Sequence, residues 1–158
     1  LRAMRQVARQ IPKALLLLVG SGPEESKLKK LIDRYQLRQN IVIESWADDL
    51  ISYYKTADIF LMTSNYEGGA RAPAEAVAAG APVAMTDVAP ANEAIKDGEN
   101  GYVVPVGNYN LLAERIIDLL GNAPLREKFR SASRKIAASF IHPKEYIKRY
   151  VATLTDLL

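Results

Sequence analysis

Short apolar runs that alternate with amphipathic segments constrain the fold of this chain more than any other feature. The runs lie at Leu15–Val19, Ile41–Ile43, Ile59–Met62, Pro82–Met85 and Tyr102–Val104. Unbroken apolar runs are typical of strands that are buried on both faces, and strands that alternate with helices form parallel sheets. The sequence therefore predicts an α/β fold: a Rossmann-like, doubly wound parallel sheet with helices on both faces.

The segments between and after these runs are predicted to be helical. Helices are expected at 1–10, 24–35, 48–54, 109–120, 124–138 and 143–158. Asn108 is a suitable N-cap for the helix that follows it. Pro82 stands at the start of its run and predicts that this strand lies near a sheet edge, where a missing N–H is tolerated.

A glycine-containing turn between the run ending at Met62 and an alanine-rich helix is the first candidate site. Backbone N–H groups at a helix start have no internal partner and favour anions. Gly68 and Gly69 would let the backbone approach a ligand, and Pro73 suits the first helical turn. The N–H groups of Gly69, Ala70 and Arg71 are the candidate phosphate donors, whereas the Arg71 side chain is more simply a solvated arginine.

Two carboxylates, Glu67 and Glu75, bracket this turn. A glutamate in the first turns of a helix often only compensates the helix dipole. Glu67, however, is expected at the carboxyl end of a strand, the usual place for ligand contacts in an open α/β sheet. A phosphate-binding turn beside hydroxyl acceptors suggests a ligand such as a nucleotide sugar.

The two glutamates, with seven residues between them, resemble the signature of family 4 retaining glycosyltransferases, which have the GT-B fold. Further resemblances follow in the family's order across nearly the whole chain: Val19-Gly20-Ser21-Gly22-Pro23-Glu24, Ile43 to Leu50, Gly80-Ala81-Pro82-Val83, Thr86-Asp87, Asp97-Gly98-Glu99-Asn100-Gly101 and Val104-Pro105. The chain departs from the family where smaller or different residues stand at Gly69, Ala70, Ala72 and Ala74. These departures bear on pocket shape and donor choice.

The resemblance implies retaining transfer of a hexose from a UDP- or GDP-linked sugar, with no cofactor and no metal, in polysaccharide biosynthesis or a related pathway. Glu67 would position hydroxyls of the transferred sugar, and Glu75 would accept hydrogen bonds from the ribose. The backbone of Gly68, Gly69, Ala70 and Arg71 would hold the diphosphate. The turn at Gly20 and Gly22 would lie beside the nucleoside and phosphates, and Ala47 would lie near the base.

The resemblance also implies that residues 1–158 form one donor-binding, C-terminal domain of a longer enzyme. The chain opens inside a predicted helix, where an α/β domain would normally place a strand first. We therefore expect a domain truncated at its N-terminus, separated from its N-terminal acceptor-binding partner. Such a fragment would bind the donor but would be inactive alone.

Two alternatives remain open at this point. The first is a sugar-nucleotide epimerase of the same architecture, which would need acid and base groups beyond these glutamates. The second is a non-catalytic α/β module that binds a phosphorylated ligand or a partner protein. The turn at Gly20 and Gly22 lacks the third glycine of a dinucleotide-binding fingerprint, so a NAD site has little support.

Composition and charge argue against nucleic-acid binding and against a metal site. The net charge of +3 is small, and no basic cluster is interleaved with aromatics, so nucleic acid is not an expected partner. There is no cysteine, and the lone His142 has no second imidazole nearby in sequence, which argues against a metal site. Asp48 and Asp49 are explained by a helix start, and Trp46 is interpreted as a core residue. The expected location is the cytoplasm, and the partner domain could add a peripheral contact with the cytoplasmic face of the membrane.

Overall fold

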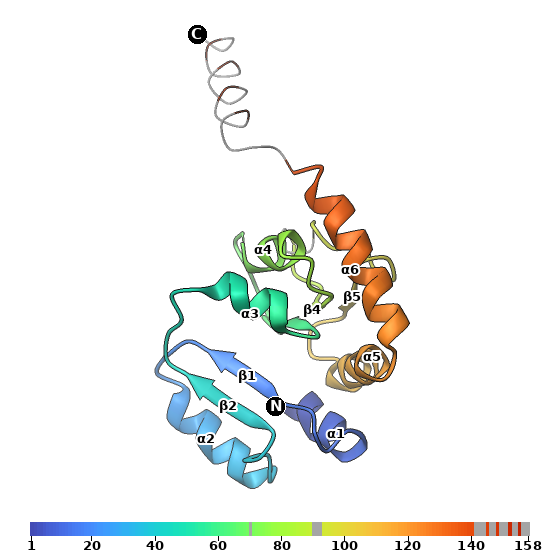
Figure 1. The fold of residues 1–158 in the computed structure, drawn as a ribbon. Helices are drawn as coiled ribbons and strands as arrows, with labels where there is room; N and C mark the ends of the chain where they lie inside the picture. Colours follow the sequence, from blue (N-terminus) through green and yellow to red (C-terminus); the bar gives the residue numbers. More distant parts are fainter. Residues whose placement is uncertain are drawn as a thin grey trace.

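The structure, a computed structural model, describes residues 1–69, 71–89 and 93–140, with the single positions 145, 148, 152 and 155 beyond them. Its helices are α1 (Arg2–Gln10), α2 (Glu25–Arg34), α3 (Leu50–Thr56), α4 (Ala72–Ala78), α5 (Tyr109–Gly121) and α6 (Ala123–Ala137). Its strands are β1 (Leu16–Val19), β2 (Ile41–Glu44), β3 (Phe60–Met62), β4 (Val83–Thr86) and β5 (Gly101–Val104). The alternation confirms the α/β class (Figure 1). The helix expected at 143–158 and His142 fall outside the described residues, those single positions apart.

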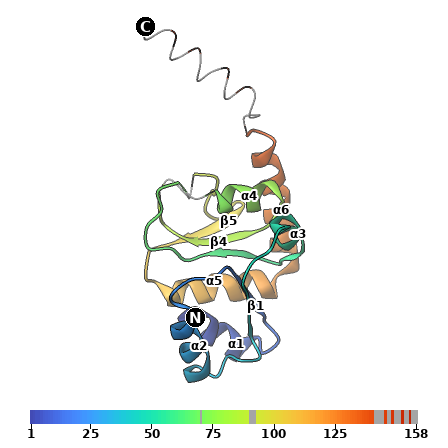
Figure 2. The same cartoon turned by 90° about the vertical axis from the view of Figure 1, so that its left-hand side faces the viewer.

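The strands form two parallel sheets where the sequence predicted one. β1 pairs with β2, with Leu16 opposite Ile41, and β3, β4 and β5 pair in that order. Among the described residues, no strand joins β1 to β3, so the sheet is divided at this point. Helices lie on both faces of the larger sheet, because α4 and α5 lie on opposite sides of β4 and β5 (Figure 2).

The prediction that the strand after Pro82 lies near an edge was wrong. β4 is the middle strand of its sheet, and all four of its residues are buried. Pro82 lies just before the strand, and its carbonyl accepts a hydrogen bond from the Phe60 N–H at 2.8 Å. The proline therefore contributes an acceptor where no donor is required, which is compatible with a central strand.

β4 separates two hydrophobic clusters. Ala84 belongs to a cluster that includes Val7 of α1 and Ile116 of α5. Met85 points to the opposite side, into a cluster that includes Tyr54 of α3. Successive strand residues face opposite sides of a sheet, so one strand contributes to both cores.

The first helix packs against a helix far along the chain. α1 lies against α5 (Figure 1), and Gln6 Nε2 donates to Asn110 Oδ1 at 2.5 Å. The predicted N-cap of α5 is confirmed, since Asn108 Oδ1 accepts from the Leu111 N–H at 3.1 Å.

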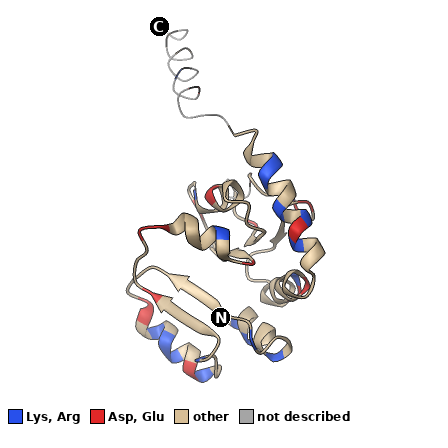
Figure 3. Ribbon diagram, viewed as in Figure 1, with Lys and Arg blue, Asp and Glu red and all other residues tan. Residues whose placement is uncertain are grey.

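The basic residues of α2 form a solvated face. Lysines and acidic residues both lie along this helix (Figure 3), and Lys27 pairs with Glu24 at 2.7 Å while Lys29 pairs with Glu25 at 2.6 Å. Exposed pairs of this kind add little stability.

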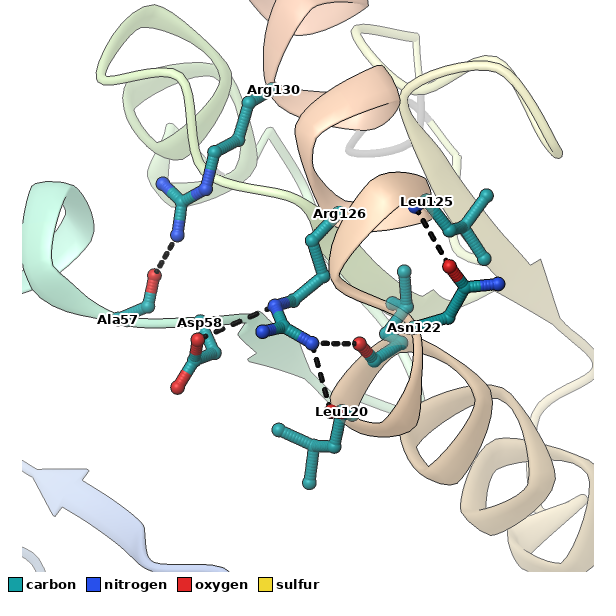
Figure 4. Close-up of polar contacts among 8 residues, drawn as sticks. Ala57, Asp58, Leu120, Asn122, Leu125, Arg126 and Arg130 are labelled. Atoms are coloured by element: carbon teal, nitrogen blue, oxygen red, sulfur yellow. Dashed lines mark hydrogen bonds and ion pairs between the residues drawn. The ribbon is translucent and has the colours of Figure 1, made fainter.

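Two arginines of α6 connect three elements (Figure 4). Arg126 Nη1 donates to the carbonyls of Leu119 and Leu120 at 2.6 and 2.8 Å, and its Nε lies 3.4 Å from Asp58 Oδ1. Arg130 Nη2 donates to the Ala57 carbonyl at 2.9 Å. Together they fix the end of α5 and the connection between α3 and β3, on which the candidate site depends.

Candidate functional site

The hydroxyls of Ser64 and Thr86 together fix Glu67, the first glutamate of the candidate site. Ser64 Oγ donates to Glu67 Oε1 at 2.5 Å. Thr86 Oγ1, at the buried end of β4, donates to the Ser64 carbonyl at 2.6 Å. The turn after β3 is thus tied to the neighbouring strand, and the half-buried Glu67 carboxylate has a defined orientation.

The glycines of the turn serve its backbone conformation. Gly69 has a φ of 141°, which residues with a side chain rarely adopt. An added Cβ at Gly68 or Gly69 would meet no atom within 4 Å, so close packing among the described residues does not require glycine here.

The start of α4 agrees with the sequence prediction. Arg71 is the exposed N-cap residue, and Pro73 lies in the first turn. Ala70 falls outside the described residues. The assignment of the Gly69, Ala70 and Arg71 N–H groups to a diphosphate stays a prediction.

The second glutamate is held by a tyrosine from another helix. Tyr54 of α3 is 8% exposed, and its hydroxyl donates to Glu75 Oε2 at 3.2 Å. Burial, and then the neighbouring Glu75 charge, raise the pKa of Tyr54. The hydroxyl acts as a donor to the exposed carboxylate.

The glycine turn after β1 borders a hollow of about 460 Å³. Its lining includes Gly20, Gly22 and, from α2 and β2, Leu28 and Ile43. Gly20 has a φ of 133°, which again favours glycine. The structure thus provides space beside this turn, where the sequence predicted part of a donor site.

Trp46 is not the core residue that the sequence suggested. Its side chain is 77% exposed, and its indole N–H donates to Asp48 Oδ1 at 2.8 Å within the same loop. The loop after β2 lies outside both hydrophobic clusters, so the ring has no core to enter. Asp49 caps α3 by accepting from the Ser52 N–H at 3.0 Å, which confirms its helix-start interpretation.

The predicted site residues fall into two groups. Glu67, Gly68, Gly69, Arg71 and Glu75 share the segment from β3 into α4. Gly20 and Gly22 follow β1, and the half-buried Ala47 follows β2, its parallel neighbour. Within the first group, the Glu75 N–H donates to the Arg71 carbonyl at 2.9 Å, and among the described residues no hydrogen bond joins the first group to the second.

Sequence reasoning missed Tyr54, Ser64 and Thr86. A tyrosine on the inward side of a short helix is a usable signal, because a buried hydroxyl needs a partner. The serine three residues before Glu67 is another local signal.

Two further features are absent from the part of the chain that the structure describes. The described residues hold no group of three metal-binding side chains. None of their helices combines the length and apolarity that a membrane span requires.

Comparison with known families identifies the chain. Residues 1–136 match the model of the family named glycosyl transferases group 1. The chain belongs to this glycosyltransferase family. The chain is 30% identical to the poly(glycerol-phosphate) alpha-glucosyltransferase of Bacillus subtilis, over 99% of the chain and 23% of that protein. The N-acetyl-alpha-D-glucosaminyl L-malate synthase of Bacillus anthracis is 26% identical over 92% of the chain and 38% of its own length.

Solved glycosyltransferase structures share the fold. TarM of S. aureus, in a complex that contains UDP, matches with a TM-score of 0.90 at 22% identity, over 95% of this chain and 31% of that one. The pneumococcal O-GlcNAc transferase GtfA, in complex with UDP and GlcNAc, matches with a TM-score of 0.85 at 28% identity, over 98% of this chain and 32% of GtfA. This glycosyltransferase domain thus spans less than two fifths of the length of these relatives.

Proposed function

We propose that this chain is the donor-binding, C-terminal domain of a family 4 retaining glycosyltransferase and that its donor is a UDP-linked sugar. The proposal rests on the segment that leads from β3 into α4. In this segment Glu67 accepts a hydrogen bond from the Ser64 hydroxyl, and Glu75 accepts one from the Tyr54 hydroxyl. The structure of GtfA, 28% identical over 98% of this chain, contains UDP and GlcNAc, which supports UDP over GDP. Membership of the family favours transfer over the epimerase and the non-catalytic module.

In this proposal the two glutamates have different partners. Glu67, whose orientation is fixed from β4 through Ser64, holds hydroxyls of the transferred sugar. The exposed Glu75 accepts from the ribose. Backbone N–H groups between Gly69 and Arg71 stabilise the charge that develops on the leaving diphosphate, a role that requires no proton transfer. Glu67 is thus a positioning residue for the sugar.

The division of the sheet supports a donor domain that continues before Leu1. Among the described residues, β1 has β2 as its strand partner and β3 has β4, so each carries an unpaired edge. Unpaired edges of buried parallel strands are costly. We assign the position between them to one parallel strand from the preceding part of the longer protein. The acceptor-binding domain, any peripheral membrane contact and catalytic turnover belong to that longer, cytoplasmic protein, so this domain alone binds without transferring.

Calorimetric titration with UDP, GDP and ADP tests the proposal. We expect selective binding of UDP and its loss in Glu75→Ala, because the ribose loses its acceptor. Glu114→Ala is the matched control, since it removes an exposed glutamate from the opposite helix α5. The titration is repeated on a longer chain that includes the preceding residues.

Absence of UDP binding in the longer chain would overturn the proposed donor. Binding that survives in Glu75→Ala would overturn the role of Glu75 alone.

A further inference from the structure

Two contacts fix the Tyr54 side chain. Its ring packs in the core, and its hydroxyl is bonded to Glu75. Its ring meets Phe60 edge to face, with centroids 5.4 Å apart and planes at 85°, inside the second hydrophobic cluster. Its hydroxyl leaves this cluster and donates to Glu75 Oε2 across the contact between α3 and α4. The hydroxyl is therefore held at one point relative to α4.

Glu75 is an exposed side chain with several rotatable bonds, and such a side chain loses rotamer freedom when a ligand binds. The Tyr54 hydroxyl restricts these rotamers before any ligand arrives. A group that is already oriented loses less freedom on binding and gives a tighter complex.

The bond also leaves acceptor capacity on the carboxylate. Two carboxylate oxygens together offer about four acceptor positions, and Tyr54 takes one of them on Oε2. Oε1 and the remaining position on Oε2 suit a pair of adjacent hydroxyls, which is the chemistry of a ribose.

We propose that Tyr54 is a positioning residue that orients Glu75 for the two ribose hydroxyls, and that it thereby contributes to selection of ribonucleotides over 2′-deoxyribonucleotides. This inference rests on the proposed function of Glu75. It assigns a specificity role to a residue of α3, outside the turn that contains both glutamates.

The alternative is that Glu75 merely satisfies the buried Tyr54 hydroxyl, with no consequence for a ligand. The two cases differ in one respect. A positioning role makes the effect of removing the hydroxyl depend on the carboxylate, whereas a structural role does not.

The test is calorimetric titration of the full-length protein with UDP and with 2′-deoxy-UDP. Tyr54→Phe keeps the ring and its contact with Phe60. We expect it to weaken UDP binding about tenfold, as for one lost hydrogen bond to a charged group, and 2′-deoxy-UDP binding by about twofold or less. In a Glu75→Gln background, Tyr54→Phe should produce no additional loss of UDP affinity.

Tyr53→Phe is the matched control. The Tyr53 hydroxyl donates to Glu44 Oε2 at 2.9 Å, so the variant removes a similar hydroxyl–carboxylate bond one residue away. We expect it to leave both affinities and their ratio unchanged. Unfolding temperatures of both variants show whether a loss of fold accompanies any change.

Glu75→Asp, with Tyr54 in place, is a second route to the same conclusion if Tyr54→Phe does not fold. The shorter side chain withdraws the carboxylate from the hydroxyl and should reduce the ratio of UDP to 2′-deoxy-UDP affinity. Full retention of that ratio in Glu75→Asp or in Tyr54→Phe would overturn the inference. If Glu75→Gln itself leaves UDP binding unchanged, the proposed function of Glu75 fails first, and the two failures are distinguished.

Discussion

Glu67 and Glu75 lie in different environments although one short segment contains both. Glu67 is half-buried and bonded within its own turn, whereas Glu75 is exposed and bonded from another helix. A carboxylate fixed inside a turn suits contacts to one defined group. The difference supports separate partners for the two side chains.

Ser64→Ala should reproduce part of the effect of Glu67→Ala. Both variants should leave UDP affinity unchanged and weaken binding of UDP-glucose or UDP-GlcNAc, by about tenfold for Ser64→Ala, because the carboxylate that we propose to hold the sugar loses its orientation or is removed. Calorimetry with the free nucleotide and the nucleotide sugar measures this separation.

Ser26→Ala, on the exposed face of α2, is the control for Ser64→Ala. An equal loss of UDP and of the nucleotide sugar in Ser64→Ala would contradict separate roles for the two glutamates.

At the level of elements, α6 stabilises the site without contributing a residue to it. Arg126 satisfies two carbonyls at the end of α5 and lies beside Asp58, just before β3. Carbonyls at a helix end have no partner within the helix. One planar guanidinium can serve both, which a lysine ammonium on a flexible stem does less well.

Arg126→Lys should therefore lower the free energy of unfolding by about 2 kcal/mol, as expected when hydrogen bonds to a charged group are lost. Urea unfolding measures the change. Arg134→Lys is the matched control, because Arg134 on the same helix pairs with Glu127 in an exposed position. That control should change stability by less than about 0.5 kcal/mol, and equal effects of the two variants would refute a special role for Arg126.

For the whole molecule, the sequence predicts the elements better than their partners. The apolar runs place every strand of the described residues, and Asn108 and Pro73 mark helix starts, because these signals are local. Pairing across the fold is not local. The central place of β4 and the Tyr54–Glu75 bond depend on residues distant in sequence, and no local pattern reports them.

The exposed Trp46 shows the same limit at the site. A lone tryptophan is usually buried on average, but here the loop and its bond to Asp48 keep the ring at the surface. The glycine turns and both glutamates were recognisable because their spacing is a property of the sequence itself. The hydroxyls that orient the glutamates were missed, because a tyrosine or a serine gains this role only from the carboxylate that the fold places beside it.

If, as proposed above, the longer protein supplies a parallel strand between β1 and β3, a chain that includes this strand should be more stable than the 158-residue chain. A parallel strand inserted between β1 and β3 would pair both free edges and bury apolar side chains on each. We expect a higher unfolding temperature and slower amide hydrogen exchange at Leu17 and Leu61, with α6 amides as the internal control. Unchanged exchange at both strands would contradict the assigned strand.

The packing of α1 against α5 also has a consequence for synthesis. A ribosome makes α1 long before α5, and at about 5–20 residues per second the delay is on the order of ten seconds. During that interval the apolar side of α1, with Met4 and Val7, has no native helix to cover it. The nascent chain therefore exposes an apolar surface, to which chaperones or other nascent chains can bind, until α5 has been made and can cover it.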